Sequence, residues 1–206
     1  MGYELWTSPI TGYRRTGTRL AELRSLIDSG LIARAILEPL QSCPAEALAV
    51  EAARMLRGKD FDIAGVKAKP NESVIGWVAT TSLTHGHVKD HMKMITADQM
   101  ISDATPVPTV LKVLRDRLHT FILVGPAVAG ILTRADLNKP PVRIYLFSLI
   151  SLLEMHLAFW VQAKYPDDSW QKKLSSKRLA AAKKVQQERR KSRQNPFLVA
   201  CLQFCD

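Results

Sequence analysis

Thr133 and Asp136 are the residues of this sequence whose types and spacing most clearly suggest chemistry. They lie in GILTRADL, residues 130–137, where a β-forming apolar run ends in the threonine and the carboxylate follows three residues later. In one interpretation they form a capping box, which satisfies free backbone amides at the start of a helix. In the other, the carboxylate accepts hydrogen bonds from two neighbouring hydroxyl groups of a ligand. The spacing alone favours the cap.

Other chemically active side chains form weaker patterns. His85, His87 and His91 are spaced like metal ligands, but no second pair of ligands is near in sequence, so we predict no metal site. No His or Cys accompanies an acid in a nucleophile motif, and there is no Gly-rich phosphate loop. Cys201 and Cys205 are four residues apart without further ligands, which favours packing. The sequence therefore predicts no catalytic activity.

The composition is that of a folded protein. With 206 residues, 47% of them apolar, the chain is long enough for one good-sized domain or two small ones. The three cysteines are an odd number, which argues against a disulfide framework and favours a reducing compartment. The N-terminus lacks the basic start and apolar run of a secretory signal. We therefore expect a cytoplasmic protein.

The elements that position GILTRADL occur twice along the chain. A helix and two short strands are predicted at 44–58, 61–66 and 73–78, and again at 104–119, 121–125 and 128–132. GWVATTSL at 76–83 aligns with GILTRADL at an offset of 54, and Phe61 aligns with Phe121 if the first hairpin is six residues longer. A helix-strand-strand unit cannot bury its sheet alone, so we expect the two copies to pack together.

This duplication resembles a tandem cystathionine-β-synthase (CBS) domain pair, a Bateman module. The matching parts are a helix leading into FDIAG or FILVG, a Gly-led strand, and the turn GILTRADL, which is close to the family pattern G-[IL]-[ILV]-T-x-x-D. KDHM at 89–92 resembles the segment with which the second repeat often opens. The resemblance spans about residues 36–140.

The resemblance implies an α/β (α+β) fold of two β-α-β-β-α CBS repeats packed as a pair, with flanking N- and C-terminal helices. The domains expected from it are an N-terminal helical extension at 1–35, repeat 1 at 36–83, a linker with repeat 2 at 84–140, and C-terminal helices at 141–206. Residues 17–37, mostly in this extension, predict an amphipathic helix that breaks near Ser29 and Gly30.

The resemblance also assigns a ligand site. In CBS pairs the Thr and Asp of this turn hold the ribose of adenosyl ligands, which implies that role for Thr133 and Asp136. The adenine packs against the first strand of the repeat and the strand after its helix, here Ile101, Ser102, Phe121 and Ile122. Arg134 is a candidate phosphate contact, although an arginine at this place is more often solvated. With the repeat in register, we favour the nucleotide site over the cap.

The first repeat departs from the family pattern at both positions. Ala79 replaces the threonine and Ser82 replaces the aspartate. Without a carboxylate, two-point capture of a ribose is lost. We therefore expect one competent site per pair, with the first-repeat site empty or weak.

The apolar run at 144–163 raises the question of a membrane span. Glu154 and His156 fall at its middle, where a charge is costly, and polar residues form one stripe. We therefore expect no membrane span but a soluble helix that packs on the module or on a second copy and buries part of its apolar surface, namely Phe147, Leu153, Phe159 and Trp160. The family resemblance implies a homodimer.

A basic helix is predicted at 171–193, where ten basic residues against one acid give +9 of the total net charge of +10. Three interpretations stay open: a solvated surface helix, a nucleic-acid contact, or a contact with an acidic protein or membrane surface. No aromatic residue interleaves the charges, so base stacking is not indicated. The candidate nucleic-acid-binding residues are Lys172, Lys173, Lys177, Arg178, Lys183, Lys184, Arg189, Arg190, Lys191 and Arg193.

Two functions follow as hypotheses. In the first, the chain is a non-catalytic regulatory protein that needs no cofactor, binds AMP, ADP or ATP as a regulatory ligand, and signals through its dimer and C-terminal helices. In the second, it is a nucleic-acid-associated factor that contacts the phosphate backbone through the basic helix, with the CBS pair only a dimerisation scaffold.

Overall fold

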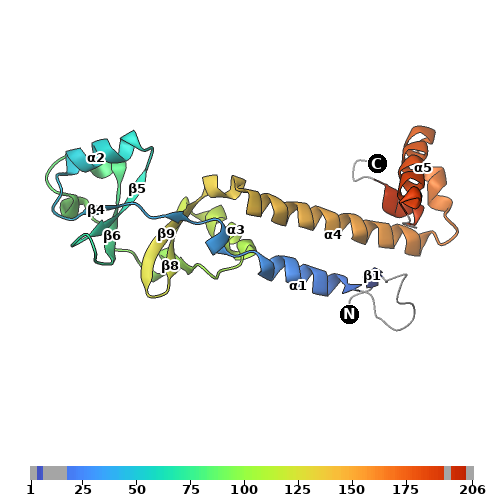
Figure 1. The fold of residues 1–206 in the computed structure, drawn as a ribbon, viewed down its shortest axis with the longest axis horizontal. Coiled ribbons are helices and arrows are strands. Elements are labelled where there is room, and N and C mark those ends of the chain that lie inside the picture. Colours follow the sequence, from blue (N-terminus) through green and yellow to red (C-terminus); the bar gives the residue numbers. More distant parts are fainter. Residues whose placement is uncertain (1–3, 7–17, 193–195, 203–206) are drawn as a thin grey trace. The chain divides into compact units, whose positions relative to one another are not determined.

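The computed structural model describes residues 4–6, 18–192 and 196–202 (Figure 1). It divides into two compact units, which are described separately: Ser29–Arg143 holds both repeats, and Met1–Asp28 with Ile144–Asp206 holds the flanking elements. The domain boundaries expected after residues 35, 83 and 140 stay predictions.

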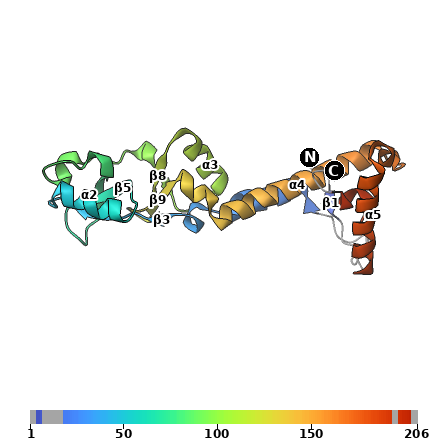
Figure 2. The same ribbon diagram turned by 90° about the horizontal axis from the view of Figure 1, so that it is seen from above.

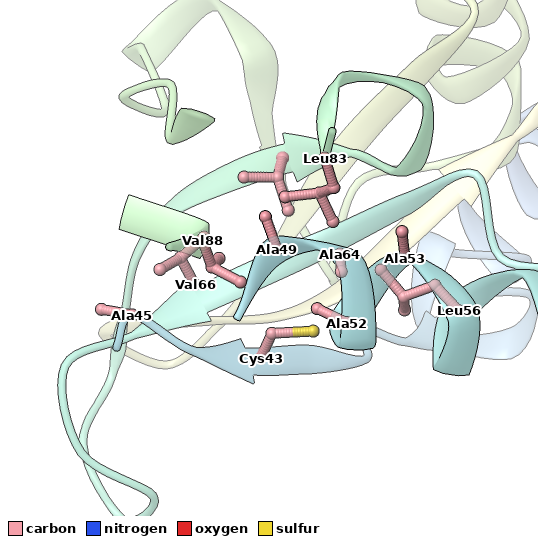
Figure 3. Packing of buried hydrophobic residues seen from close by; sticks show 11 residues of the cluster. Cys43, Ala45, Ala49, Ala52, Ala53, Leu56, Ala64, Val66, Leu83 and Val88 are labelled. Atoms are coloured by element: carbon pink, nitrogen blue, oxygen red, sulfur yellow. The ribbon is translucent and has the colours of Figure 1, made fainter. Parts of the chain in front are cut away.

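Repeat 1 consists of three strands and one helix. Its elements are β4 (Ser42–Pro44), α2 (Ala49–Gly58), β5 (Ile63–Lys67) and β6 (Val74–Ala79), with β4 parallel and β6 antiparallel to the central β5. The helix turns Ala49, Ala52, Ala53 and Leu56 onto the sheet, a spacing of three and four residues that forms one apolar face. Figure 3 shows these side chains packed around Cys43, Ala64 and Val66. Small alanines let the helix lie close to the strands.

Repeat 2 has the same order. Its elements are β7 (Met100–Ser102), α3 (Val107–Asp116), β8 (His119–Val124) and β9 (Ala127–Thr133), again with a parallel and an antiparallel neighbour on the central strand. The buried positions of α3 are Val107, Val110 and Leu114, which correspond to Ala49, Ala52 and Leu56 of α2. The α/β fold and the duplication are therefore confirmed.

The two sheets also share their register. The paired residues Ser42, Gly65 and Trp77, which lie side by side across the three strands of repeat 1, correspond to Met100, Phe121 and Ile131 in repeat 2. In both hairpins the pairing also shifts at the same place, directly after the residue that faces the leading glycine, Gly76 or Gly130. The offset of 54 between GWVATTSL and GILTRADL is thus confirmed. The alignment of Phe61 with Phe121 is wrong, because Phe121 corresponds to Gly65. The connection from α3 to β8 is two residues shorter than that from α2 to β5, which shifts the strand relative to the helix.

The segment leading into each repeat pairs with the other repeat. β3 (Glu38–Pro39), ahead of repeat 1, pairs antiparallel with β9 at the edge of the second sheet (Figure 2). Lys93, ahead of repeat 2, pairs in the same way with Trp77 of β6. Two further bridges, Ile32 with Pro106 and His87 with Leu48, repeat the exchange at the helix starts. Each repeat thus completes its partner's sheet edge, which explains how units that cannot fold alone become stable together.

The closing element of each repeat is a 3-10 helix. Thr80–Ser82 follows β6 and Arg134–Asn138 follows β9. In repeat 2, α4 (Pro140–Lys164) starts directly behind this turn. GILTRADL therefore forms the end of β9 and a tight turn before Pro140, which is suited to the first position of a helix.

The second unit contains the remaining elements. β1 (Glu4–Trp6) pairs with β2 (Thr18–Arg19), and α1 (Leu20–Gly30) ends at the expected break. The hydroxyl of Tyr145 in α4 donates to Asp28 of α1 at 3.0 Å. The Ser169–Lys173 and Leu198–Cys201 segments are 3-10 helices, with α5 (Ser176–Lys191) between them. The basic helix therefore starts later than the predicted residue 171, because the Ser175 hydroxyl accepts from the amide of Arg178 and caps the helix there.

Helix α4 carries much exposed apolar surface. Three of the four side chains expected to be buried are exposed within this chain, namely Phe147, Leu153 and Trp160, while Phe159 is half-buried. Among the described residues, α4 is the one helix long and apolar enough to cross a membrane, with a mean hydropathy of 1.7 in its most apolar 18-residue window and 11% of that window buried.

Candidate functional site

Asp136 holds the end of β9 in place. One carboxylate oxygen, Oδ2, accepts from the backbone N–H of Thr133 at 2.8 Å and from its hydroxyl at 3.1 Å. The residue is only 6% exposed. The returning half of a capping box is therefore present, and the threonine hydroxyl points to the acid. The structure does not show the open pair of oxygens that the sequence predicts.

The second oxygen of Asp136 is occupied by Lys139. The Lys139 Nζ lies 2.9 Å from Asp136 Oδ1, 2.5 Å from Glu38 Oε1 and 2.5 Å from the carbonyl oxygen of Ile36. Burial disfavours the charged ammonium, but the hydrogen bonds to Glu38 and Asp136 outweigh it and raise the pKa of Lys139. Lys139 thereby links the turn of repeat 2 to the segment that leads into repeat 1.

Arg134 caps helix α3. Its Nε donates to the carbonyl oxygen of Leu114 and its Nη2 to that of Arg115, both at 2.9 Å. Repeat 1 needs no such cap, because its longer connection folds back and the amide of Phe61 donates to Leu56 O at 3.0 Å. The candidate phosphate contact therefore has a structural task here, and its geometry gives the phosphate role no support.

The four residues predicted to surround an adenine are brought together on two strands. Ile101 of β7 pairs with Ile122 of β8, and Ser102 and Phe121 are their chain neighbours. Phe121 and Ile122 are fully buried, whereas the Ser102 hydroxyl accepts from the amide of Ala104 at 3.1 Å. The Ile122 and Phe121 side chains thus belong to the core of the repeat.

An aromatic group next to Thr133 escaped the sequence analysis. His119 pairs with Thr133 across the β8–β9 hairpin, and its ring lies 5.3 Å from that of Phe121 and 5.2 Å from that of Trp77 in repeat 1. Burial lowers the pKa of His119. Lys93 Nζ lies 5.2 Å from the Trp77 ring. Among the described residues, Trp77 Nε1 is the buried side-chain donor without a hydrogen-bond partner. The one sequence feature that could have indicated this aromatic group is the position of Trp77 directly after the leading Gly76.

A cavity of about 490 Å³ opens in repeat 1. Its lining comes from one face of α2 and from the chain after the Thr80–Ser82 turn, and consists of Val50, Ala53, Arg54, Arg57, Leu83 and Thr84. At the first-repeat site, Ser82 Oγ donates to the carbonyl oxygen of Ala79 at 2.7 Å, so the serine stabilises its own turn. Whether this site binds a ligand stays a prediction.

Solved structures provide the comparisons. No protein-family model and no curated protein matches the sequence. An uncharacterised conserved protein from Pyrococcus horikoshii is 18% identical, with 53% of this chain and 91% of that chain covered and a TM-score of 0.47. CBSX2, a CBS-pair protein from Arabidopsis thaliana, is 17% identical, with 56% and 94% covered and a TM-score of 0.46. The CBS domain of a bacterial CNNM/CorC family Mg²⁺ transporter, solved with ATP, is 14% identical, with 60% and 94% covered and a TM-score of 0.47.

The resemblance to CBS-domain pairs is confirmed. It is a likeness of fold, and in this chain it agrees with the strand order and register of both repeats. The part of the chain that resembles a CBS pair is the unit Ser29–Arg143, and α5 and most of α4 lie outside it.

The histidines ahead of repeat 2 have other contacts. His91 Nε2 lies 2.6 Å from the carbonyl oxygen of His85, and the backbone N–H of His87 donates to Asp90 at 2.7 Å. Within the described part of the chain, no group of three or more His, Cys, Asp or Glu side chains is placed to hold a metal ion. Cys43 and Cys201 are buried free thiols, and burial raises the pKa of Cys43. Cys205 lies outside the described residues.

The candidate basic residues that the structure describes, between Lys172 and Lys191, are exposed. Lys172 and Lys173 lie in the 3-10 helix before α5, the other described members lie on α5 itself, and Arg193 lies outside the described residues. Arg189 donates to the carbonyl oxygen of Ala200 at 3.2 Å. Ala182 is the buried residue of α5, so this helix presents charge around most of its circumference.

Proposed function

We propose that this chain is a non-catalytic regulatory protein whose CBS pair binds an adenine nucleotide, AMP, ADP or ATP, around Thr133 and Asp136. The observation that carries the proposal is the position of the Asp136 carboxylate. It closes repeat 2 and, through Lys139, reaches Glu38 ahead of repeat 1. A carboxylate in a shielded place between two repeats forms strong hydrogen bonds with hydroxyl groups that replace its partner.

In this proposal Lys139 occupies the ligand's position in the empty protein. The ribose hydroxyl groups replace the Lys139 ammonium on Asp136 Oδ1, and the released ammonium becomes a counter-ion for the phosphate. Lys139 directly precedes Pro140, the first residue of α4. Ligand binding therefore changes the start of α4, which is the route by which the C-terminal helices report it.

The aromatic group supports the same site. Thr133 pairs with His119, so a base attached to the bound ribose lies near the rings of His119 and Trp77. Aromatic faces stack with adenine, and the buried Trp77 N–H is a donor for a ring nitrogen. The solved structures of CBSX2 with AMP and of the CNNM/CorC CBS domain with ATP concern those proteins alone.

Calorimetric titration with adenosine, AMP, ADP and ATP tests the proposal. We expect at least one nucleotide to bind, and Asp136→Asn to weaken binding about 10-fold or more, because the charge-assisted bonds are lost. Ser82→Ala, the corresponding change in repeat 1, is the control and leaves affinity unchanged. We expect Lys139→Met to bind adenosine more tightly than the wild type does, and the difference in affinity between adenosine and AMP to become smaller. Absence of binding by the wild type, or unchanged affinity in Asp136→Asn, refutes the proposal.

A second candidate function rests on the exposed basic residues of 172–191. In it, the chain binds nucleic-acid backbone through α5, and the CBS pair serves as a dimerisation scaffold. Electrophoretic shifts with duplex DNA test this, and binding has to fall steeply with salt, by a slope of about 0.9 per phosphate contacted. Replacing Lys183 and Lys184 with glutamine lowers that slope by about two if both contact phosphates. A shift that does not depend on salt refutes this function.

The remaining parts of the proposal concern setting. We place the protein in the cytoplasm, where adenine nucleotides and reduced cysteines occur together. We also propose a homodimer without a membrane span. Cell fractionation tests the cytoplasmic location, because recovery of the protein in the membrane pellet contradicts it.

A further inference from the structure

Helix α4 carries a regular stripe of exposed apolar side chains. Leu146, Ile150, Leu153, Leu157 and Trp160 follow one another at spacings of four, three, four and three residues, and each is 42–55% exposed. This is the spacing of the a and d positions of a coiled coil, which places all five along one line. The stripe is about 21 Å long at 1.5 Å per residue.

The stripe is distinct from the face that α4 uses within its own chain. Tyr145 and Leu152 are buried, at 2% and 6% exposure, and the Tyr145 hydroxyl donates to Asp28 of α1. The five residues of the stripe lie about a quarter of a turn away from this face. One apolar side of α4 is thus covered within the chain and the adjacent side is exposed to solvent.

From this geometry we infer that the α4 stripe is a seam between two copies of this chain. A stripe of apolar residues is complementary to itself, as a two-fold symmetric interface requires. With Phe147 beside it, 69% exposed, it presents on the order of 600 Å² per copy, so that a dimer buries about 1,200 Å². That is the lower limit of specific protein interfaces. The inference rests on the homodimer proposed above and does not depend on nucleotide binding.

A second copy fits the helix better than a lipid bilayer does. A bilayer surrounds a helix on all sides, whereas Ser148, Ser151 and Gln162 place polar groups, with the exposed Ile144 among them, on the side of α4 away from the stripe. Glu154 stands near the middle of the helix, where a carboxylate in hydrocarbon is costly. A partner helix covers one side only and leaves the polar side in water.

Sedimentation of the full 206-residue chain tests the seam. We expect a dimer for the wild type, a dissociation constant raised about 100-fold in Leu153→Glu, and no change in Ser148→Glu on the polar side. Circular dichroism confirms that both variants stay helical. A monomeric wild type, or a dimer that Leu153→Glu leaves intact, overturns the inference.

Cross-linking gives a second measurement that does not depend on stability. Leu153→Cys lies at the centre of the stripe and forms a disulfide-linked dimer on mild oxidation, whereas Ser148→Cys gives no more than the wild-type background. Flotation with vesicles of neutral phospholipid tests the alternative, in which the stripe binds a membrane. Recovery of the wild type with the vesicles, together with the absence of the Leu153→Cys cross-link, assigns the stripe to a membrane and overturns the seam.

Discussion

Replacement of Asp136 separates the structural task of this carboxylate from its proposed ligand role. Asp136→Ala removes the acceptor of the shielded Thr133 N–H, the acceptor of the Thr133 hydroxyl, and one of three acceptors of Lys139. A buried donor left without a partner costs about 1–3 kcal/mol, and the loss of a cap costs about 0.5–2 kcal/mol. These two costs overlap, so we expect the free energy of unfolding to fall by about 2–4 kcal/mol.

Asp136→Asn is the informative intermediate. Its amide oxygen still accepts from Thr133 N, and Lys139 keeps Glu38 and the carbonyl oxygen of Ile36. We therefore expect a loss of about 1 kcal/mol, since the amide NH2 that replaces Oδ1 cannot accept from Lys139 and a single charge-assisted interaction at a partly exposed lysine is lost. This variant stays folded and is thus the proper one for nucleotide titration.

Urea unfolding, followed by circular dichroism, measures these differences, provided that the m-value stays constant. Ser82→Ala is the matched control, because it removes only the bond to the carbonyl oxygen of Ala79 and is expected to cost below about 1 kcal/mol. If Asp136→Ala costs no more than Ser82→Ala, the carboxylate does not hold the turn, and our account of the site is wrong.

Three further predictions concern the surroundings of the site. Gly76→Ala is expected to cost about 2–3 kcal/mol, because the added Cβ comes within 2.6 Å of Lys93 O and of Met92 Cγ, whereas Gly130→Ala meets its nearest atoms at 3.1–3.2 Å and costs about 1 kcal/mol. Urea unfolding has to rank them in this order. Arg134→Met removes both donors on the end of α3 and lowers the free energy of unfolding by about 1 kcal/mol in the same assay; an unchanged midpoint contradicts the cap. Because burial lowers the pKa of His119 from 6.5, the unfolded chain takes up this proton first and stability falls as the pH drops below 6.5. In His119→Phe this part of the pH dependence disappears, which unfolding above and well below pH 6.5 detects.

Local features of the sequence were sufficient for the helix and the hairpin of each repeat and for their order, whereas the first strands, β4 and β7, followed only from the family resemblance. The alanines at helical spacing and the recurrence of a Gly-led strand predict these elements, because such signals depend on residues close in the chain. The start of the first helix was predicted wrongly, because Pro44 ends β4 and α2 begins only at Ala49. They also locate Thr133 and Asp136 at a strand-to-turn junction. The position of Phe121 was misjudged, since the shared letter suggested Phe61 as its counterpart, whereas the strand pairing places Phe121 at the position of Gly65, four residues later.

Tertiary structure alone decided what the carboxylate does. Lys139 meets Ile36 across 103 residues, and no local pattern places them together. The exchange of β3 and the Lys93 segment between repeats likewise depends on how the two sheets pack. Spacing predicted both a cap and a ligand hook, because both need an acceptor three residues after a strand. Only the arrangement of a lysine and a glutamate from the two ends of the CBS pair determined which partners occupy that acceptor.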